Sequence, residues 1–271
     1  MLIADSGSTK TTWASIGADT KTIVTVGLNP RVTGEEQFVA VLCSVRHQLE
    51  GTLPGTIRFF GAGCGTEESR NQVKNYILQV FPHASVTVES DLTGACIALC
   101  GQHEGCVGIL GTGSNACQYD GSSIVKRNVS LGYILGDEGS GNHLGRMLLK
   151  GYFNGSMPQM LGDEFRKAYD ITVEGVLQHL YQEQGVNRYL ASFVPFIRDH
   201  RDYPYLHQLL LDAFGSYFQE QVQPLGCDTL HLVGSVAAVF HKELSEAAQT
   251  YGIAVGTVMK EPIEGLIKNL N

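Results

Sequence analysis

Clusters of lysine and arginine are missing from the sequence, so the chain lacks the positive patch that nucleic-acid-binding proteins carry. Its 27 acidic residues outnumber its 19 basic ones, and the formal net charge at pH 7 is −8. Apolar runs long enough to cross a bilayer are also missing, and no membrane partner is expected. At 271 residues and 43% hydrophobic composition, the chain can form two globular domains or one large one.

The sequence has no pair of cysteines at CxxC spacing, and its cysteine count is odd. Most of the cysteines lie inside apolar patterns, which predicts buried, reduced thiols in a cytoplasmic protein and disfavours a metal or iron–sulfur site within one chain. The first glycine loop follows the opening residues directly, so we expect no signal peptide. The cysteines are Cys43, Cys64, Cys96, Cys100, Cys106, Cys117 and Cys227.

One short pattern occurs twice, each time directly after an apolar run. The first copy ends in Asp5–Thr9 (Asp-Ser-Gly-Ser-Thr), and the second ends in Gly111–Asn115 (Gly-Thr-Gly-Ser-Asn). Each predicts a buried strand that turns into a tight glycine loop, where backbone N–H groups can approach phosphate oxygens. A single loop of this kind is also compatible with an ordinary hairpin turn. Two loops in matching positions favour a polyphosphate held from both sides, as in a two-lobed phosphotransferase.

The hydrophobic patterns divide the chain into two similar halves with the element order βββαβαβα. In the first half, strands are expected at 2–5, 11–17, 22–27, 56–60 and 85–88, and helices around 38–49, 66–80 and 92–100. In the second half, strands are expected at 106–110, 115–119, 123–127, 229–233 and 252–256, and helices at 141–150, 235–248 and 261–270.

This duplicated plan predicts two similar α/β domains that face each other across a cleft. The polar, glycine-flanked stretch Gly101–Gly105 is the expected hinge, which gives an N-terminal domain over 1–103 and a C-terminal domain over 104–271. A long helical insertion at about 158–225 interrupts the second copy, and the terminal helix is free to pack back on the N-terminal domain.

The first loop joins two strands, so we expect a hairpin rather than the strand-to-helix turn of a P-loop. Asp5 at the strand end would lie beside bound phosphates, where a carboxylate is tolerated only with a compensating cation. We therefore expect Asp5 to hold Mg²⁺ directly or through water. The expected phosphate-binding residues of the two loops are Gly7, Ser8, Thr9, Lys10, Gly111, Thr112 and Gly113.

Two aspartates stand before predicted helices, where each could serve the helix or a ligand. Asp91 closes a strand and precedes a helical run, so it is either an N-cap or a general base that accepts the proton of an acceptor hydroxyl. Asp137 lies in the glycine-rich turn Leu135–Gly141, and it is either a cap or a ligand for polyol hydroxyls. Gly234-Ser235 links a strand to a helix, a common nucleotide-binding position, whereas Asn29-Pro30 reads as a turn.

Together these motifs resemble the BadF/BadG/BcrA/BcrD-type ATPases and, among them, the N-acetylglucosamine kinases of the actin/Hsp70/hexokinase superfamily. The resemblance covers the whole chain and implies two ribonuclease-H-like domains around a nucleotide cleft. It also implies that Asp91, in Asp-Leu-Thr-Gly-Ala, is the catalytic base and that Gly234 and Ser235 form the adenosine loop. The sugar-binding residues that it implies are Asn29, Asp91, Thr112, Ser114, Asn115 and Asp137.

The resemblance predicts an ATP- and Mg²⁺-dependent kinase that phosphorylates an amino sugar such as N-acetylglucosamine, at C6, and acts as a cytoplasmic homodimer. The stretch Ser130–Tyr133 departs from the vertebrate-like pattern, since it lacks a tryptophan, and Trp13 is the only one in the chain. One alternative is an ATPase that activates a radical dehydratase or reductase through an iron–sulfur cluster. Those activators have a cysteine at the start of a Cys-Ala-Ala-Gly-Thr-Gly run, whereas here Gly111-Thr112-Gly113 follows Gly108-Ile109-Leu110, without that cysteine. A nucleotide-binding sensor without turnover is a third alternative.

Overall fold

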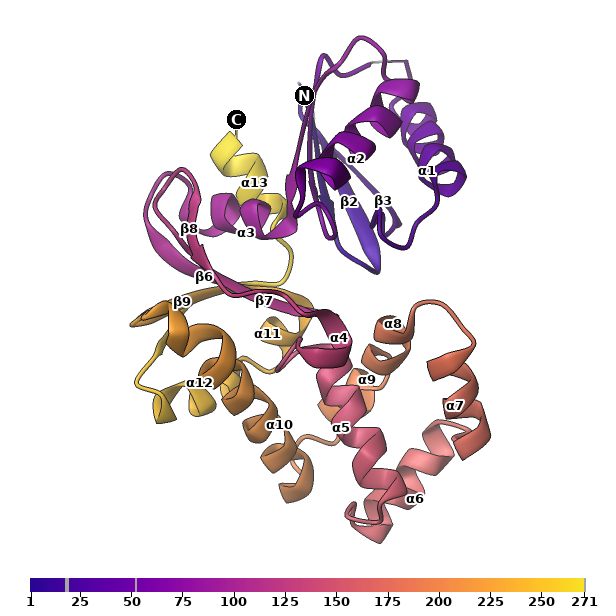
Figure 1. Ribbon diagram of the computed structural model, residues 1–271, viewed down its shortest axis with the longest axis vertical. Coiled ribbons are helices and arrows are strands. Elements are labelled where there is room, and N and C mark those ends of the chain that lie inside the picture. The colour runs from indigo at the N-terminus through magenta and orange to yellow at the C-terminus, as the bar shows by residue number, and fades with distance from the viewer. Residues whose placement is uncertain (18–19, 52, 271) are drawn as a thin grey trace. The chain divides into compact units, whose positions relative to one another are not determined.

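The computed structural model describes residues 1–17, 20–51 and 53–270 (Figure 1). The chain divides into two compact units. Unit 1 comprises Met1–Gly105, Tyr119–Ile124 and the segment that starts at Glu261. Unit 2 comprises Cys106–Gln118 and Val125–Lys260.

The sheet of unit 1 has five strands in the order β3-β2-β1-β4-β5. Strands β1, β2 and β3 form an antiparallel meander, and β4 and β5 continue the sheet in parallel with β1. The strands are β1 (Leu2–Ser6), β2 (Lys10–Ser15), β3 (Lys21–Val26), β4 (Thr56–Gly61) and β5 (Ser85–Ser90). The helices of the unit are α1 (Glu35–Gln48), α2 (Glu67–Val80), α3 (Asp91–Cys100) and α13 (Ile263–Leu270).

Alternation along β1 sends its side chains to two faces with different coverings. Leu2 and Ala4 join a core with Trp13, Phe38 and Phe59, on the face that α1 and α2 cover. The other face is covered by α3 and α13, which pack closely through small residues. A Cβ on Gly94 would lie 2.8 Å from Phe60, and a Cβ on Gly265 would lie 2.4 Å from the Ala98 carbonyl oxygen. Asp5 lies on this second face.

The second sheet repeats the plan of the first, in the order β10-β9-β6-β7-β8. Strand β6 pairs in parallel with β9, and β9 pairs in parallel with β10. The strands are β6 (Gly105–Leu110), β7 (Ser114–Tyr119), β8 (Ile124–Arg127), β9 (Thr229–Val233) and β10 (Ala254–Met259). Because β6, β7, β8, β9 and β10 occupy the sheet positions of β1 to β5 in turn, the predicted duplicated α/β fold is confirmed.

Helices dominate the rest of unit 2. The short α4 (Gly132–Leu135) precedes α5 (Gly141–Phe153), and a largely helical region separates α5 from β9. Its core is aromatic, with Phe165 packed against Phe193 and Phe196. This region contains α6 (Gln159–Ala168), α7 (Val173–Tyr181), α8 (Val186–Ala191), α9 (Val194–Asp199), α10 (Pro204–Tyr217), a π-helical turn (Phe218–Val222) and a 3₁₀ turn (Gln223–Leu225). The remaining helices are α11 (Ser235–Val239) and α12 (His241–Thr250).

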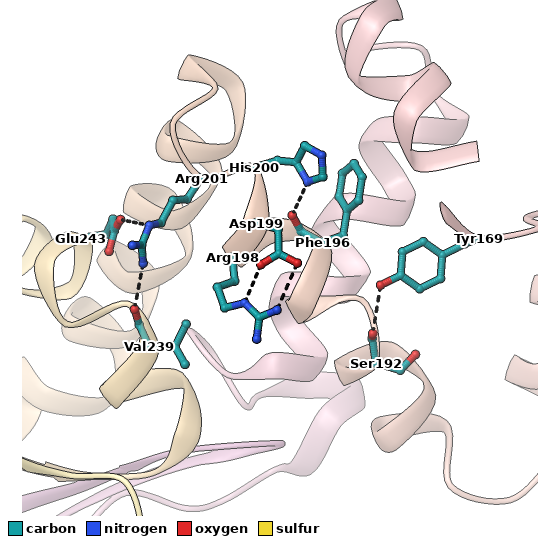
Figure 2. Close-up of polar contacts among 9 residues, drawn as sticks. All are labelled: Tyr169, Ser192, Phe196, Arg198, Asp199, His200, Arg201, Val239 and Glu243. Atoms are coloured by element: carbon teal, nitrogen blue, oxygen red, sulfur yellow. Dashed lines mark hydrogen bonds and ion pairs between the residues drawn. The ribbon is translucent and has the colours of Figure 1, made fainter. Parts of the chain in front are cut away.

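Polar contacts attach the helical region to the helices that follow β9 (Figure 2). The Arg201 guanidinium donates to the Val239 carbonyl oxygen at 3.2 Å and lies 4.0 Å from the buried Glu243 carboxylate. Arg198 and Asp199 form an ion pair at 2.7 Å on the exposed side of α9. The two contacts of Arg201 tie the chain after α9 to α11 and α12, so the insertion packs as part of unit 2.

Two sequence predictions were wrong in detail. The helix expected over 235–248 is divided at Phe240, whose fully buried ring packs near Phe214, so the chain turns inward between α11 and α12. The strand expected at 252–256 begins at Ala254 instead, because Gly252, with φ +67°, still belongs to the turn after α12.

The prediction of reduced thiols throughout was also wrong, since Cys106 and Cys227 form a disulfide. Cys106 lies at the start of β6 and Cys227 lies just before β9, so the parallel pairing of these strands brings the two sulfurs together. A separation of 121 residues left no local signal of this pair. Among the described residues, no helix is long and apolar enough to span a membrane.

Candidate functional site

The loop after β1 is fixed by the end of β3. The buried Ser6 hydroxyl bonds to Thr11 at 2.7 Å and donates to the Leu28 carbonyl oxygen at 3.0 Å. The Gly27 amide donates to the Thr9 carbonyl oxygen at 3.0 Å, and a Cβ on Gly27 would lie 2.4 Å from the Gly7 oxygen. The loop itself is open, because a Cβ on Gly7 would meet its first neighbour only at 3.7 Å. The fold therefore requires glycine behind the loop and leaves the loop surface free for a ligand.

Asp5 stands at the carboxyl end of β1 among other carboxylates. Burial, together with the nearby charges of Asp91 and Glu261, raises the pKa of Asp5 from 3.8 to about 7, while the charge of Lys10 opposes this shift. Lys10 itself forms an ion pair with Glu261. The unit thus places the predicted metal ligand, the predicted base and the predicted phosphate-binding lysine in one electrostatic cluster.

The position of Asp91 separates its two possible roles. The N-cap of α3 is Ser90, whose hydroxyl oxygen accepts from the Thr93 amide at 3.1 Å. The capping alternative for Asp91 was therefore wrong: Asp91 is the first helical residue, and its Oδ1 accepts from the Leu92 amide at 2.9 Å.

The residues around Asp5 fit a hard divalent cation. Asp5 and Asp91 raise the free energy of each other's ionised form, and a cation between ligand phosphates and these oxygens would relieve that repulsion. Thr12, opposite Asp5 in the strand register, has a buried Oγ1 without a hydrogen-bond partner in the described part of the chain. Over residues 1–17, 20–51 and 53–270, no group of three or more His, Cys, Asp or Glu side chains forms a metal cage. The carboxylate oxygens of Asp5 and Asp91 are ligands of the kind that Mg²⁺ prefers.

The second loop, Gly111–Ser114, follows β6 as the first follows β1. A Cβ on Gly111 would have no neighbour within 4 Å, so this glycine is not required by packing and leaves its backbone open to approach. Gly113 differs, because its Cβ would lie 2.9 Å from the Asp137 carboxylate. Gly234, with φ +128°, brings the turn after β9 against the same loop, where a Cβ would lie 2.1 Å from the Leu110 oxygen. Unit 2 thus brings together Gly111 and Gly234, which the sequence placed far apart.

Asp137 is held against the second loop in the left-handed backbone region, with φ +59°. Its Oδ1 accepts from the Ser114 amide at 3.3 Å, and its Oδ2 accepts from the Asn142 side-chain amide at 2.8 Å. Burial raises the pKa of Asp137, and these two hydrogen bonds act in the opposite direction. Its carboxylate therefore binds the loop, and its remaining lone pairs are available to hydroxyl donors.

The neighbours of Asp137 maintain the turn. Buried Glu138 accepts from Gln221 at 2.7 Å, and the His143 ring accepts from the Gly139 amide at 2.9 Å. Burial and the charge of Arg146 lower the pKa of His143 to about 4, so the ring is neutral and can accept this bond. These hydrogen bonds therefore anchor the turn between Asp137 and α5.

Two other predicted sugar ligands use their side chains locally. Asn29 Oδ1 accepts from the Arg31 amide at 3.0 Å, which makes an Asx turn, and it lies against Gly63. Asn115 Oδ1 accepts from the Ala116 amide at 2.9 Å at the start of β7. Both side chains are half-buried at the ends of strands next to the loops.

Sequence reasoning missed three residues near these loops: Thr12, Asn142 and Glu261. Thr12 follows another threonine within a strand, and Asn142 lies in the first turn of a helix, where an asparagine gives no functional signal. Glu261 lies more than two hundred residues from Lys10, its partner. Only the strand register could have suggested Thr12, and nothing in the local pattern indicated the other two.

A duplicated five-stranded sheet with a glycine loop after the first strand of each copy defines the class: the fold is that of the actin, Hsp70 and hexokinase superfamily. No protein-family model and no curated protein matches the chain. Among solved structures, the chain is similar to the "putative N-acetylglucosamine kinase" of Porphyromonas gingivalis, with 35% identity and a TM-score of 0.92, over 99% of this chain and 98% of that one. At this identity over nearly the full length of both, the chain belongs to the same family as the P. gingivalis protein.

Two more distant structures share the fold. A "putative N-acetylglucosamine kinase" from Chromobacterium violaceum is 17% identical, with a TM-score of 0.73 over 100% of this chain and 99% of that one. A ROK family glucokinase from Streptomyces griseus, solved with glucose and AMPPNP, is 15% identical, with a TM-score of 0.61 over 99% of this chain and 97% of that one. These three proteins are described as sugar kinases. Membership of the BadF/BadG family stays a prediction.

Proposed function

We propose that the chain is an ATP-dependent sugar kinase that transfers the γ-phosphoryl group to a hydroxyl of an amino sugar. The observation that carries the proposal is the pair of open glycines, Gly7 and Gly111, each directly after the first strand of a repeated sheet. Packing does not require glycine at either position, so we infer that the missing side chain leaves space for a ligand. The family relationship to the P. gingivalis protein supports a sugar acceptor.

Asp91 is the proposed general base. Its carboxylate is half-buried and stands in the first turn of α3, whose N-cap is Ser90, and as general base it would orient the acceptor hydroxyl and accept its proton. The proposed acceptor is the C6 hydroxyl, because a primary hydroxyl is the least hindered. The proposed sugar contacts are Asn29, Thr112, Ser114, Asn115 and Asp137.

The proposed phosphate contacts are the amides and side chains of Gly7, Ser8, Thr9, Lys10, Gly111, Thr112 and Gly113, with Gly234 and Ser235 at the adenosine. Asp5, with Asp91 near it, would hold Mg²⁺, which when bound neutralises charge on the phosphoryl oxygens. Lys10 would turn from Glu261 toward a phosphate, since the two partners compete for one ammonium group. A cytoplasmic homodimer remains part of the proposal, and sedimentation of the purified protein tests the dimer.

A screen for sugar-dependent ADP release tests this function. The panel contains N-acetylglucosamine, glucosamine, N-acetylmannosamine, N-acetylmuramic acid and glucose, each with ATP and Mg²⁺. We expect one amino sugar to raise ADP release far above the sugar-free rate in the wild type and not in Asp91→Asn. ADP release that no sugar changes would contradict the proposal, and a brown, iron-containing preparation would support the activator alternative.

A further inference from the structure

The start of α5 is bonded to the second glycine loop at three successive points. The Gly141 amide donates to the Gly111 carbonyl oxygen at 2.8 Å, and the Asn142 amide donates to the Thr112 carbonyl oxygen at 3.1 Å. The Asn142 side-chain amide donates to the same Thr112 oxygen at 2.7 Å and to Asp137 Oδ2 at 2.8 Å. Asp137 completes a ring of bonds by accepting from the Ser114 amide at 3.3 Å.

The side chain of Asn142 has only one orientation that suits this ring. Both of its neighbours, the Thr112 carbonyl and the Asp137 carboxylate, are acceptors, so the nitrogen must face them. Asn142 is fully buried, and no helix-capping role occupies it, because Ser140 is the N-cap of α5. Its function in the fold is therefore to join Thr112 to Asp137.

The ring also leaves hydrogen-bonding capacity unused. Ser114 Oγ and Asn142 Oδ1 are both buried and have no hydrogen-bond partner among the residues that the structure describes. Both atoms belong to residues bonded to the Asp137 carboxylate. Because buried polar atoms are nearly always satisfied in folded proteins, this pair marks a place where a bound molecule or ordered water completes the ring.

We propose that Asn142 is a positioning residue of the phosphoryl-transfer site: it fixes the sugar ligand Asp137 to the loop that holds Thr112, so that sugar and nucleotide are bound by one rigid unit. This inference rests on the proposed function for its kinetic consequences. Its structural part, that Asn142 holds Asp137 on the Ser114 amide, stands apart from any activity. A misplacement of about 1 Å in such a site can lower the rate roughly a hundredfold.

The test compares Asn142→Asp with Ser140→Ala. The aspartate has the shape of asparagine but, when ionised, cannot donate a hydrogen bond and repels the Asp137 carboxylate. Ser140→Ala removes the α5 cap, whose bond to the His143 amide measures 3.4 Å, and leaves the ring intact. If Asn142→Asp does not fold, Asn142→Ala takes its place, because it removes the donor without adding a charge.

The first readout is amide hydrogen exchange at Ser114, which does not depend on activity. We expect exchange at Ser114 to be at least about tenfold faster in Asn142→Asp than in the wild type and unchanged in Ser140→Ala. Unchanged protection at Ser114 in the Asn142 variant would overturn the proposal, even if the protein phosphorylates no sugar.

The second readout is kinetic. We expect kcat/KM for the sugar to fall about a hundredfold in Asn142→Asp, and the same substitution to cost much less in an Asp137→Asn background, because the two residues act together. Equal losses in both backgrounds would overturn the positioning role. A wild type without sugar kinase activity would instead refute the proposed function and leave the exchange result to judge this inference.

Discussion

The two glycine loops occupy equivalent places in the two sheets but treat their carboxylates in opposite ways. After β1, Asp5 lies among Asp91 and Glu261, and its ionised form is opposed by burial and by its neighbours. After β6, the nearby carboxylate of Asp137 receives hydrogen bonds from Ser114 and Asn142. In the first arrangement the ionised carboxylate is disfavoured unless a cation is bound, whereas in the second the carboxylate is hydrogen-bonded and supports the loop. The same duplicated fold therefore holds a carboxylate that repels its neighbours in unit 1 and a carboxylate that is already hydrogen-bonded in unit 2.

The largest expected effect tests the charged side of this comparison. Asp91→Asn should lower kcat by about 10²- to 10⁴-fold, because a general base contributes that much to proton transfer. Stability should stay near that of the wild type, because Ser90 caps α3. Steady-state kinetics and thermal unfolding of the same preparation check both parts. Retention of more than about a tenth of wild-type kcat would remove Asp91 from the role of base.

A second prediction concerns how ionisation of Asp5 changes the free energy of unfolding. Its pKa is raised from 3.8 to about 7 in the folded protein, so the folded state binds a proton that the unfolded state has released. Stability from this group is present below pH 4 and is lost as the pH rises toward 7, by up to ~4 kcal/mol. Asp5→Asn should therefore unfold at higher denaturant concentration than the wild type at pH 7 and lose this pH dependence, while turnover falls sharply. If the free energy of unfolding of the wild type, without added metal, does not change from pH 4 to pH 7, the raised pKa of Asp5 is contradicted.

Two pairs of glycines distinguish positions where packing requires glycine from positions in the open loops. Gly27→Ala and Gly234→Ala should lower the free energy of unfolding by more than about 2 kcal/mol, because their Cβ atoms would lie 2.4 Å and 2.1 Å from backbone atoms. Gly7→Ala and Gly111→Ala should leave it within about 1 kcal/mol and weaken ATP binding instead. Denaturant titration and calorimetric ATP binding on the four variants check this. Normal ATP binding by Gly7→Ala and Gly111→Ala would show that neither loop approaches phosphate.

The disulfide gives a smaller effect that distinguishes the units. Cys106 and Cys227 join β6 to the chain before β9, and unit 1 has no cysteine at the start of β1. Cys227→Ser should lower the stability of the β6–β9 pair by about 2–4 kcal/mol. Hydrogen exchange should rise in β6 and β9 and stay unchanged in β1 and β4. A free-thiol count of seven in the native, unreduced protein would show that the bridge does not form in solution.

Much of this fold was predictable because its signals are local. The strand–loop–strand patterns at Asp5 and Gly111 are contained in a few residues, and their repetition predicted the order of elements along both halves of the chain. The break at Phe240 was not predictable, since the helical pattern continues through it and only the packed core draws the ring inward. The N-cap of α3 is Ser90 and not Asp91. Both residue types are good N-caps, and the local sequence does not show which of two adjacent candidates takes that position.

The candidate site was predictable only in its loops. The glycines identify the loops in the sequence, but the residues that contact and support these loops come from elsewhere in the chain. Glu261 reaches Lys10 from the C-terminal segment, and Asn142 reaches Thr112 from a helix of ordinary composition. Such partners are brought together by tertiary packing, which the hydrophobic periodicity of the sequence does not predict.

The most direct test of the kinase assignment is ³¹P NMR of the reaction products. Wild-type protein incubated with ATP, Mg²⁺ and the amino sugar selected by the screen should produce ADP and one new phosphomonoester signal, whose coupling places the phosphate on C6. Asp91→Asn, at the same protein concentration, should produce neither in the same time. Conversion of ATP to ADP and inorganic phosphate, with no phosphorylated sugar, would contradict the account.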